Sequence, residues 1–179
     1  MTLPRYHIHK HQISPFWNDE YKNLKYVNEP FNDPVSVNQW ISQGYQSKIT
    51  GDLCDMRHTL PSWNHKFIEY YEAKGWKDIG VAYYRMHTGT VMPNHSDLYK
   101  RYIELFNLQG KEQTIRRALV LLEDWKSGHY LEVDGDPIVN WKRGDWVTWN
   151  YNTPHYAGNI GIESRYTMQI TGMHDDQSK

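Results

Sequence analysis

Four residues that lie far apart in the chain have the types and spacing for metal chemistry: His95, Asp97, His155 and Arg165. His95 and Asp97 are two positions apart, so both side chains can leave the same face of an extended strand. With the second imidazole of His155, they could bind one triangular face of a metal ion and leave the opposite positions open. Arg165, further along, offers a fixed cation to a carboxylate. The pattern predicts a metal centre beside an anion site.

The other histidines have a weaker sequence context. His174 to Asp176 repeats the His-x-acid spacing in a polar tail, but no histidine or arginine follows to complete a site. Imidazoles alternate from His7 to His11, where we expect a solvated edge segment. The remaining histidines are expected to be structural or surface residues: His58, His65, His87 and His129.

Arg165 begins a predicted strand whose two faces differ in character. Arg165, Thr167 and Gln169 share one face because side chains alternate along a strand. The other face carries Tyr166, Met168 and Ile170. An unpaired guanidinium is costly to bury in a packed core. The polar face is therefore predicted to line a cavity that binds an anion, and the alternative is a solvent-facing strand surface.

The elements that must position these residues change type along the chain. Helix-end signals and apolar spacing predict helices over 33–44, 62–74 and 97–108, with Ser62 as the cap of the second. Short runs with strand composition follow one another closely. They cover residues 79–86, 115–122, 129–133, 137–141, 146–150 and 164–171. So many short strands predict a sandwich or barrel.

Turn residues separate these strands. Gly89 and Pro93 predict a break in the chain directly before His95. Asp134-Gly135 is a hairpin signal of the type with positive φ. Within 146–150, the even and odd positions form two faces that both contain tryptophan, so either face could point inward.

Bulk composition narrows the classes of protein. The 179 residues suit one domain, with helical or irregular support in 1–77, a strand-rich core in 78–172 and a polar tail in 173–179. The 20 Lys and Arg against 21 Asp and Glu argue against a nucleic-acid binder. A lone Cys54, no apolar run of membrane-span length and no signal-peptide start favour a cytoplasmic protein without a membrane partner. Oligomeric state is not predicted.

Four motifs occur in a fixed order along the second half of the chain. They are His95-Ser96-Asp97, the run 144–149 (GDWVTW), the run 154–159 (PHYAGN) and Arg165-Tyr166-Thr167. Together they resemble the 2-oxoglutarate/Fe(II)-dependent dioxygenases, and 141–170 is most similar to the aspartyl/asparaginyl β-hydroxylase-like and prolyl hydroxylase-like branches. The resemblance covers residues 78–172, while 1–77 match no family. It implies a mainly β double-stranded β-helix, a cupin-like jelly roll with flanking helices and the iron at its open end.

The resemblance also implies roles for single residues. His95, Asp97 and His155 would bind Fe(II), and Asp97 matters because some Asp/Asn hydroxylase-like relatives lack the carboxylate. Such a centre would use O2 and 2-oxoglutarate to hydroxylate a C–H bond of a small molecule or an amino-acid side chain, releasing succinate and CO2. The alternative is a cupin-type metal protein without 2-oxoglutarate chemistry, either a different metalloenzyme or a sensory or binding module.

The co-substrate site implied by the resemblance includes one departure from the family. Arg165 would pair with the C5 carboxylate of 2-oxoglutarate, and Thr167 would add a hydroxyl. Where many relatives have a tyrosine this chain has Met86, so Tyr84 on the same strand face is the candidate hydroxyl. Arg117 is a candidate contact to co-substrate or substrate, or else a surface cation. Residues 99–102 could meet an anionic or aromatic substrate, although the favoured explanation is a solvated helix face.

Overall fold

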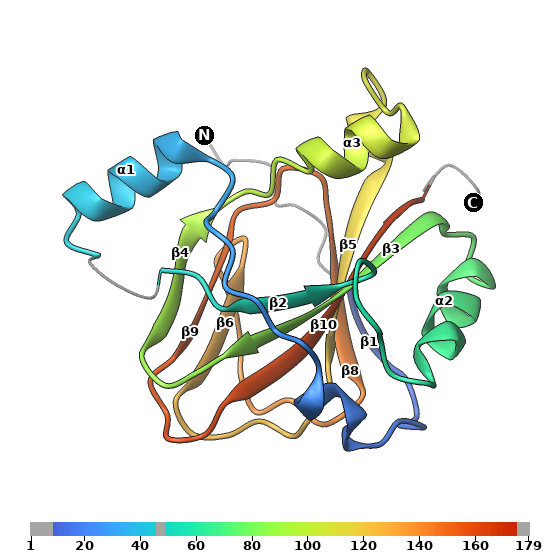
Figure 1. The fold of residues 1–179 in the computed structure, drawn as a ribbon, viewed down its shortest axis with the longest axis horizontal. Coiled ribbons are helices and arrows are strands. Elements are labelled where there is room, and N and C mark those ends of the chain that lie inside the picture. The colour runs from blue at the N-terminus through green and yellow to red at the C-terminus, as the bar shows by residue number, and fades with distance from the viewer. Residues whose placement is uncertain (1–8, 46–48, 175–179) are drawn as a thin grey trace.

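Ten β-strands and three α-helices form the protein in a computed structural model that describes residues 9–45 and 49–174 (Figure 1). The strands are β1 (His9–Gln12), β2 (Asp52–Asp55), β3 (Lys77–Met86), β4 (Thr90–His95), β5 (Ile115–Leu121), β6 (His129–Val133), β7 (Asp136–Ile138), β8 (Asp145–Asn150), β9 (His155–Asn159) and β10 (Arg165–Met173). The helices are α1 (Pro34–Ser42), α2 (Asn64–Glu72) and α3 (Lys100–Phe106), with 3-10 turns at Asp19–Asn23 and Glu112–Thr114.

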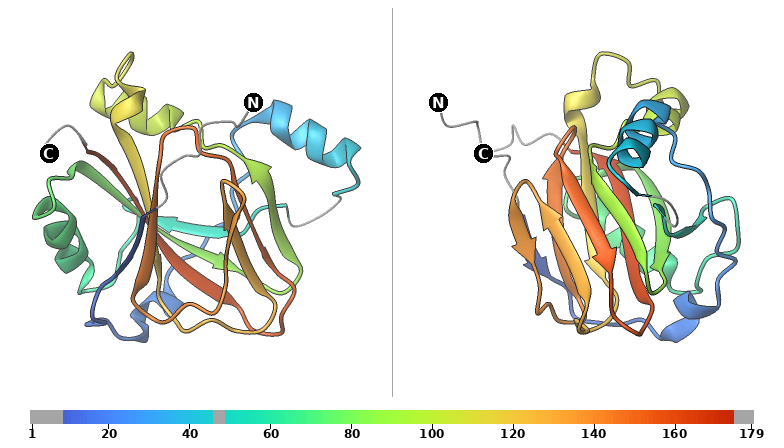
Figure 2. Two further views of the ribbon diagram at one scale, coloured as in Figure 1. Left: turned by 180° about the vertical axis from the view of Figure 1, so that it is seen from behind. Right: turned by 90° about the vertical axis from the view of Figure 1, so that its left-hand side faces the viewer.

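The strands pair in two antiparallel sheets. The large sheet has the order β1-β8-β5-β10-β3-β2, and the small sheet has the order β4-β9-β6-β7. Figure 2 shows the two sheets facing each other, with α1 and α3 at one end of the sandwich. The predicted fold class, a mainly β double-stranded β-helix with flanking helices, is confirmed.

Apolar side chains fill the space between the sheets. Their positions on the strands alternate, so one face of each strand supplies the shared core. The members are Leu119, Leu121, Leu131, Val133, Ile138, Trp141, Val147 and Trp149. The structure thus decides the orientation of β8, because Val147 and Trp149 point between the sheets while Trp146 packs outside them.

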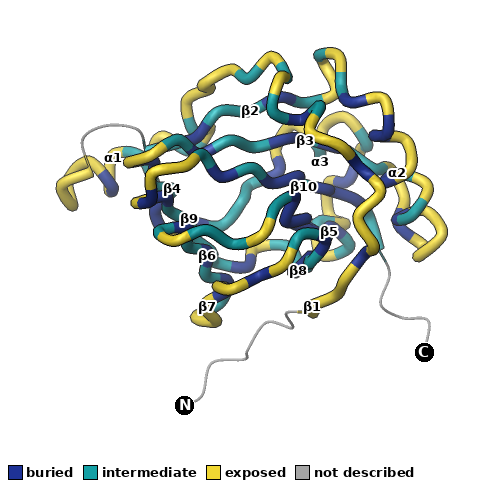
Figure 3. The backbone as a smooth tube through the Cα atoms, turned by 90° about the horizontal axis from the view of Figure 1, so that it is seen from below, coloured by how far each residue is buried: buried dark blue, intermediate teal, exposed yellow. Residues whose placement is uncertain are grey.

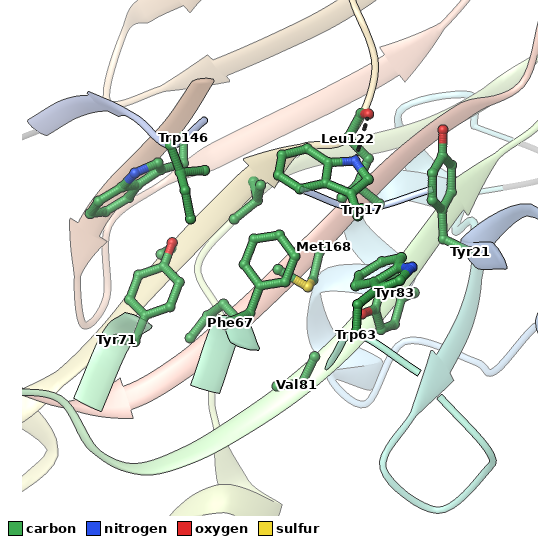
Figure 4. Close-up of a cluster of buried hydrophobic side chains, with 14 of the residues drawn as sticks. Trp17, Tyr21, Trp63, Phe67, Tyr71, Val81, Tyr83, Leu122, Trp146 and Met168 are labelled. Atoms are coloured by element: carbon green, nitrogen blue, oxygen red, sulfur yellow. Dashed lines mark hydrogen bonds between the residues drawn. The ribbon is translucent and has the colours of Figure 1, made fainter. Parts of the chain in front are cut away.

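A second core covers the outer face of the large sheet. There Phe67 and Tyr71 of α2 pack on Val120 and Met168, and Trp17 closes the cluster through a hydrogen bond from Nε1 to the carbonyl of Leu122 (Figure 4). Figure 3 shows that the middle strands of the large sheet are buried along much of their length. This core holds β10 and β5 rigid, and their opposite face is free to carry polar groups.

Helix ends follow the sequence signals in one case and not in the other. Asp33 caps α1 by accepting the Val35 N–H at 3.2 Å, as the Asp-Pro pair predicts. The cap predicted for α2 is wrong: Trp63 precedes the helix without a side-chain cap bond. The Ser62 hydroxyl instead donates to Glu20 at 3.0 Å, because a long-range carboxylate competes for it.

Three strand predictions need correction, and one turn is confirmed. The break predicted before His95 is confirmed at Gly89, which lies in the turn between β3 and β4, but is wrong at Pro93. Strand β4 runs through Pro93, which is tolerated because β4 is an edge strand with a register shift at this point. Strands β2 and β9 were not predicted, and β7 ends at Ile138 instead of extending to Trp141. The Asp134-Gly135 turn has the expected positive φ angles of 50° and 82°. None of the described helices is both long and apolar enough to span a membrane.

Candidate metal centre and anion site

Strand pairing brings the two candidate imidazoles together. His95 ends β4 and His155 begins β9, and these two residues are direct partners in the small sheet. Their ring centroids are 4.3 Å apart. Asp97 follows two residues after His95, and one ligand atom from each of the three residues lies within 4.8 Å of the others. The predicted triad is therefore assembled at the end of the sandwich where α1 and α3 lie (Figure 1).

Backbone carbonyls orient both imidazoles. His95 Nδ1 is 2.7 Å from the carbonyl oxygen of Pro93, and His155 Nδ1 is 3.0 Å from that of Thr153. Since a carbonyl only accepts, each Nδ1 must carry a proton, and Nε2 is the nitrogen of each ring that could bind a metal. Both Nε2 atoms are 3.8 Å from an Asp97 oxygen. Two imidazole nitrogens and one carboxylate fit a facial metal site with open positions.

Electrostatics keep His155 and Asp97 in the protonation states that metal binding requires. Burial lowers the pKa of His155 to about 4, so the ring is neutral near pH 7. Burial raises the pKa of Asp97, but the Arg117 guanidinium and the two imidazoles outweigh it, and the pKa lies well below its usual range. A neutral imidazole and an ionised carboxylate bind a cation without first losing a proton.

Arg165 is a buried cation without a carboxylate partner among the described residues. Only 3% of it is exposed, and burial lowers its pKa to about 10. Its Nη1 is 3.2 Å from the Met86 sulfur and its guanidinium faces the Trp141 ring at 5.5 Å, whereas Nε has no hydrogen-bond partner in the described structure. Burying such a charge is costly unless an anion compensates it.

One cavity of about 240 Å³ connects Arg165 with the triad. The predicted polar face of β10 lines it, since Arg165, Thr167 and Gln169 all point inward. Tyr84 lines it too, and its hydroxyl accepts the Gly51 N–H. Burial raises the pKa of Tyr84 to about 12, so the phenol keeps its proton. The cavity therefore offers a guanidinium and two hydroxyls beside a metal-type ligand set.

Arg117 lies inside the cavity, not on the surface. Its Nη2 is 3.0 Å from Asp97 Oδ2, and its Nη1 is 3.3 Å from the Gln169 amide oxygen. Its guanidinium also faces the ring of Tyr99 at 5.0 Å. Tyr99 is buried, whereas the next two residues of the predicted substrate-facing stretch, Lys100 and Arg101, are exposed.

The N-terminal third supplies contacts that the motifs did not reveal. The rings of Phe31 and Trp40 lie edge-on to His95 at 5.0 and 5.9 Å. Gly51 packs so closely on Tyr84 that an added Cβ would lie 2.9 Å from its ring. These residues come from a part of the chain without family resemblance, and only their aromatic character could have suggested a pocket wall.

The other histidines that the structure describes lie outside this cavity. His11 stacks on Trp146 in the exposed edge strand β1, and His129 is buried with Nε2 3.0 Å from the Glu163 carbonyl. His174 packs on Trp76. His7 and residues 175–176 lie outside the described residues. Within those residues, the triad is the only group of three or more candidate metal ligands.

Comparison with known proteins supports the fold. No protein family model matches the chain, and no curated protein matches it by sequence. A prolyl-4-hydroxylase from Pseudomonas putida superposes with a TM-score of 0.54 and 12% identity, covering 79% of this chain and 83% of that one. The cupin domain of Schizosaccharomyces pombe Cnp3 superposes with a TM-score of 0.41 and 10% identity, covering 69% of this chain and 61% of that one. KdgF from a Halomonas species superposes with a TM-score of 0.42 and 11% identity, covering 75% of this chain and 89% of that one. The superposition on the prolyl-4-hydroxylase shows that the chain shares the fold of that structure.

Proposed function

We propose that this protein is an Fe(II)- and 2-oxoglutarate-dependent dioxygenase. It would hydroxylate a C–H bond of a small molecule or an amino-acid side chain and release succinate and CO2. The observation that carries the proposal is the buried Arg165, whose charge has no carboxylate partner in the described structure and which lines the same cavity as His95, Asp97 and His155. A dicarboxylate that reaches from the metal to Arg165 would fill open positions of the metal with one end and neutralise the Arg165 charge with the other.

Each group in the cavity has a role in this proposal. His95, Asp97 and His155 would hold the metal through two nitrogens and one oxygen. Arg165 would pair with the distal carboxylate of 2-oxoglutarate, with Thr167 and Tyr84 as hydroxyl donors. The bound iron and co-substrate supply the oxidative chemistry, and the chain binds and orients them.

Apolar side chains complete the wall of this cavity. They come from both sheets: Leu119, Leu131, Trp149 and Ala157. Such a wall excludes water from the reacting groups and strengthens the charge pairing at Arg165. A peptidyl or small-molecule substrate would enter past residues 29–32 and 50–53, which form the N-terminal side of the cavity.

A cupin metal protein without 2-oxoglutarate chemistry needs the triad but not Arg165. Anaerobic titration with Fe(II) and 2-oxoglutarate distinguishes the two, because only chelation of the metal by the 2-oxo acid produces a weak visible charge-transfer band. We expect the band in wild type and its loss in His155→Ala. Arg165→Ala should weaken binding of 2-oxoglutarate by roughly 100-fold, as expected for loss of a charge-assisted bidentate contact, and leave Fe(II) affinity near that of wild type.

Two surface variants serve as matched controls, because His65 and Arg101 are exposed residues of the same types. His65→Ala and Arg101→Ala should retain the band and both affinities. A wild-type protein without the band, or a band that persists in His155→Ala, would contradict the proposal. Equal loss of Fe(II) and 2-oxoglutarate in Arg165→Ala would assign Arg165 a structural role instead.

A further inference from the structure

The two oxygens of the Asp97 carboxylate have different surroundings. Oδ1 lies 3.8 Å from His95 Nε2. Oδ2 lies 3.8 Å from His155 Nε2 and also accepts a hydrogen bond from Arg117 Nη2 at 3.0 Å. Oδ2 is therefore already engaged by a cation of the chain, and the Tyr99 phenol is a second hydrogen-bonding neighbour of this carboxylate.

Arg117 is itself held in place on the rigid large sheet. Gln169 of β10 accepts from Nη1 at 3.3 Å, and the Tyr99 ring faces the guanidinium. The Arg117 carbonyl accepts the Thr148 hydroxyl at 2.8 Å, which ties its backbone to β8. Asp97, by contrast, lies in the connection between β4 and α3, where no sheet fixes it. Arg117, whose position is the better fixed of the two, therefore determines where the Asp97 carboxylate lies.

The backbone conformation of Tyr99 is a second observation that the surrounding structure fixes the Arg117–Asp97 pair. Its φ of 49° places a non-glycine residue in the left-handed region directly before α3. Non-glycine residues adopt this backbone conformation at a cost in free energy, and such strain persists where contacts with the surrounding structure hold the residue in place. Here the strained backbone turns the phenol inward against Arg117, two residues after Asp97.

We propose that Arg117 is a positioning residue that makes Asp97 a single-oxygen metal ligand. Its N–H group occupies Oδ2, so Oδ1, which has no arginine partner and lies near His95 Nε2, is the oxygen that would bind the metal. A carboxylate that bound through both oxygens would take one of the positions that a facial site leaves open. Gln169 and Tyr99 support this role by fixing the guanidinium. The inference rests on the proposed metal site, and it replaces the alternative in which Arg117 contacts 2-oxoglutarate directly.

A double-mutant cycle with Co(II) as the probe tests the inference without any co-substrate. Co(II) is titrated into metal-free wild type, Arg117→Met, Asp97→Ala and the double variant, and binding is followed by calorimetry and by the visible absorption of the metal. We expect Arg117→Met to lower Co(II) affinity about 10- to 100-fold when Asp97 is present. On the Asp97→Ala background it should change affinity by less than about twofold, because its target is gone.

Spectroscopy adds a readout that a purely structural role would not move. The Co(II) absorption of Arg117→Met should differ in intensity and position from that of wild type, since the coordination by Asp97 changes. Arg117→Lys should restore part of the affinity, because an ammonium can still donate to Oδ2. Arg116→Met is the matched control, since the neighbouring arginine lies on the opposite face of β5 and outside this cavity; it should bind Co(II) like wild type.

Gln169→Leu keeps the inference falsifiable if Arg117→Met does not fold. It leaves the Arg117–Asp97 pair present but removes one of its supports, and we expect a smaller loss of Co(II) affinity that again disappears on the Asp97→Ala background. Equal losses on both backgrounds, or no loss in either Arg117→Met or Gln169→Leu, would overturn the inference. Failure of the charge-transfer band with an intact Arg117–Asp97 coupling would overturn the proposed function alone.

Discussion

Arg117 and Arg165 lie in the same cavity, on the neighbouring strands β5 and β10, yet their charges meet different surroundings. Arg117 pairs with Asp97, and although burial alone would lower its pKa, the nearby Tyr99 phenol and Asp97 carboxylate raise the pKa above its usual value. Arg165 has no carboxylate partner among the described residues, and burial, only partly offset by the Tyr84 phenol, lowers its pKa to about 10. The chain itself neutralises the first charge and leaves the second without an anionic partner in the described structure.

This difference separates two functions of buried charge. The Arg117–Asp97 ion pair helps to hold Asp97 beside His95 and His155, and removing one member would leave the charge of the other uncompensated. The lone charge at Arg165 is unfavourable for the folded protein without a ligand. In the proposed function, Arg165 is therefore the one place in the cavity where an anion would be bound.

The largest expected effect is on stability. Arg117→Met should destabilise the metal-free protein by about 4 kcal/mol, because the Asp97 charge loses its buried partner. Arg165→Met should be neutral or stabilise it by about 1 kcal/mol, since an apolar side chain replaces an unpaired buried cation. Urea unfolding measures both, with the exposed Arg101→Met as the control. Similar destabilisation by the two substitutions would remove the distinction between the arginines.

A second effect depends on pH, and its largest single contribution is expected from His155. His155 has its pKa lowered from 6.5 to about 4, so between these values the unfolded chain binds more protons than the folded one. Stability of the metal-free protein should therefore fall by up to about 3 kcal/mol as the pH drops through this window. The Asp97 pKa is also lowered, so its contribution is lost only at lower pH, and Arg165 does not titrate there.

Unfolding curves between about pH 7 and pH 4 test this expectation. His155→Gln should reduce the slope because glutamine does not titrate, while groups such as His129, whose pKa burial also lowers, maintain the remainder. The exposed His65→Gln should leave the slope unchanged, and an undiminished slope in His155→Gln would contradict the assignment to His155.

The smallest expected effect concerns the Arg165 end. Tyr84→Phe should lower affinity for 2-oxoglutarate about fivefold, near 1 kcal/mol, because one neutral hydrogen bond is lost, and it should leave Co(II) affinity unchanged. Tyr83→Phe is the control, since Tyr83 points to the opposite face of β3 and bonds Asn64 at 2.8 Å. A loss of metal affinity in Tyr84→Phe would mean that the two ends of the cavity are coupled.

The sequence predicted the parts of the site whose geometry is local. The alternation after Arg165 assigns Thr167 and Gln169 to its own face of β10, because strand periodicity is a property of the backbone. The two-residue step from His95 to Asp97 likewise needs no tertiary information to place both at one strand end. The Asp33-Pro34 start of α1 and the Asp134-Gly135 turn are equally local signals.

The break predicted at Pro93 shows that local sequence signals cannot determine a strand whose assignment depends on its position in the sheet. Proline ends a strand in general, but β4 lies at a sheet edge and tolerates the missing N–H. Strand β2 escaped prediction for a related reason, since its four residues are strand only because they pair with β3. In both places the strand assignment depends on pairing with residues far away in the sequence.

By itself, the sequence of this protein determined which residues could form a metal centre, which strand face would carry an anion site and what class of fold would hold them. Only the tertiary structure decided that Arg117 pairs with Asp97, that Arg165 has no carboxylate partner in the described chain and that the rings of Phe31 and Trp40 cover His95. Periodicity and turn chemistry act over a few residues, whereas the neutralisation of a buried charge depends on which distant side chains the packed sheets bring within hydrogen-bonding distance.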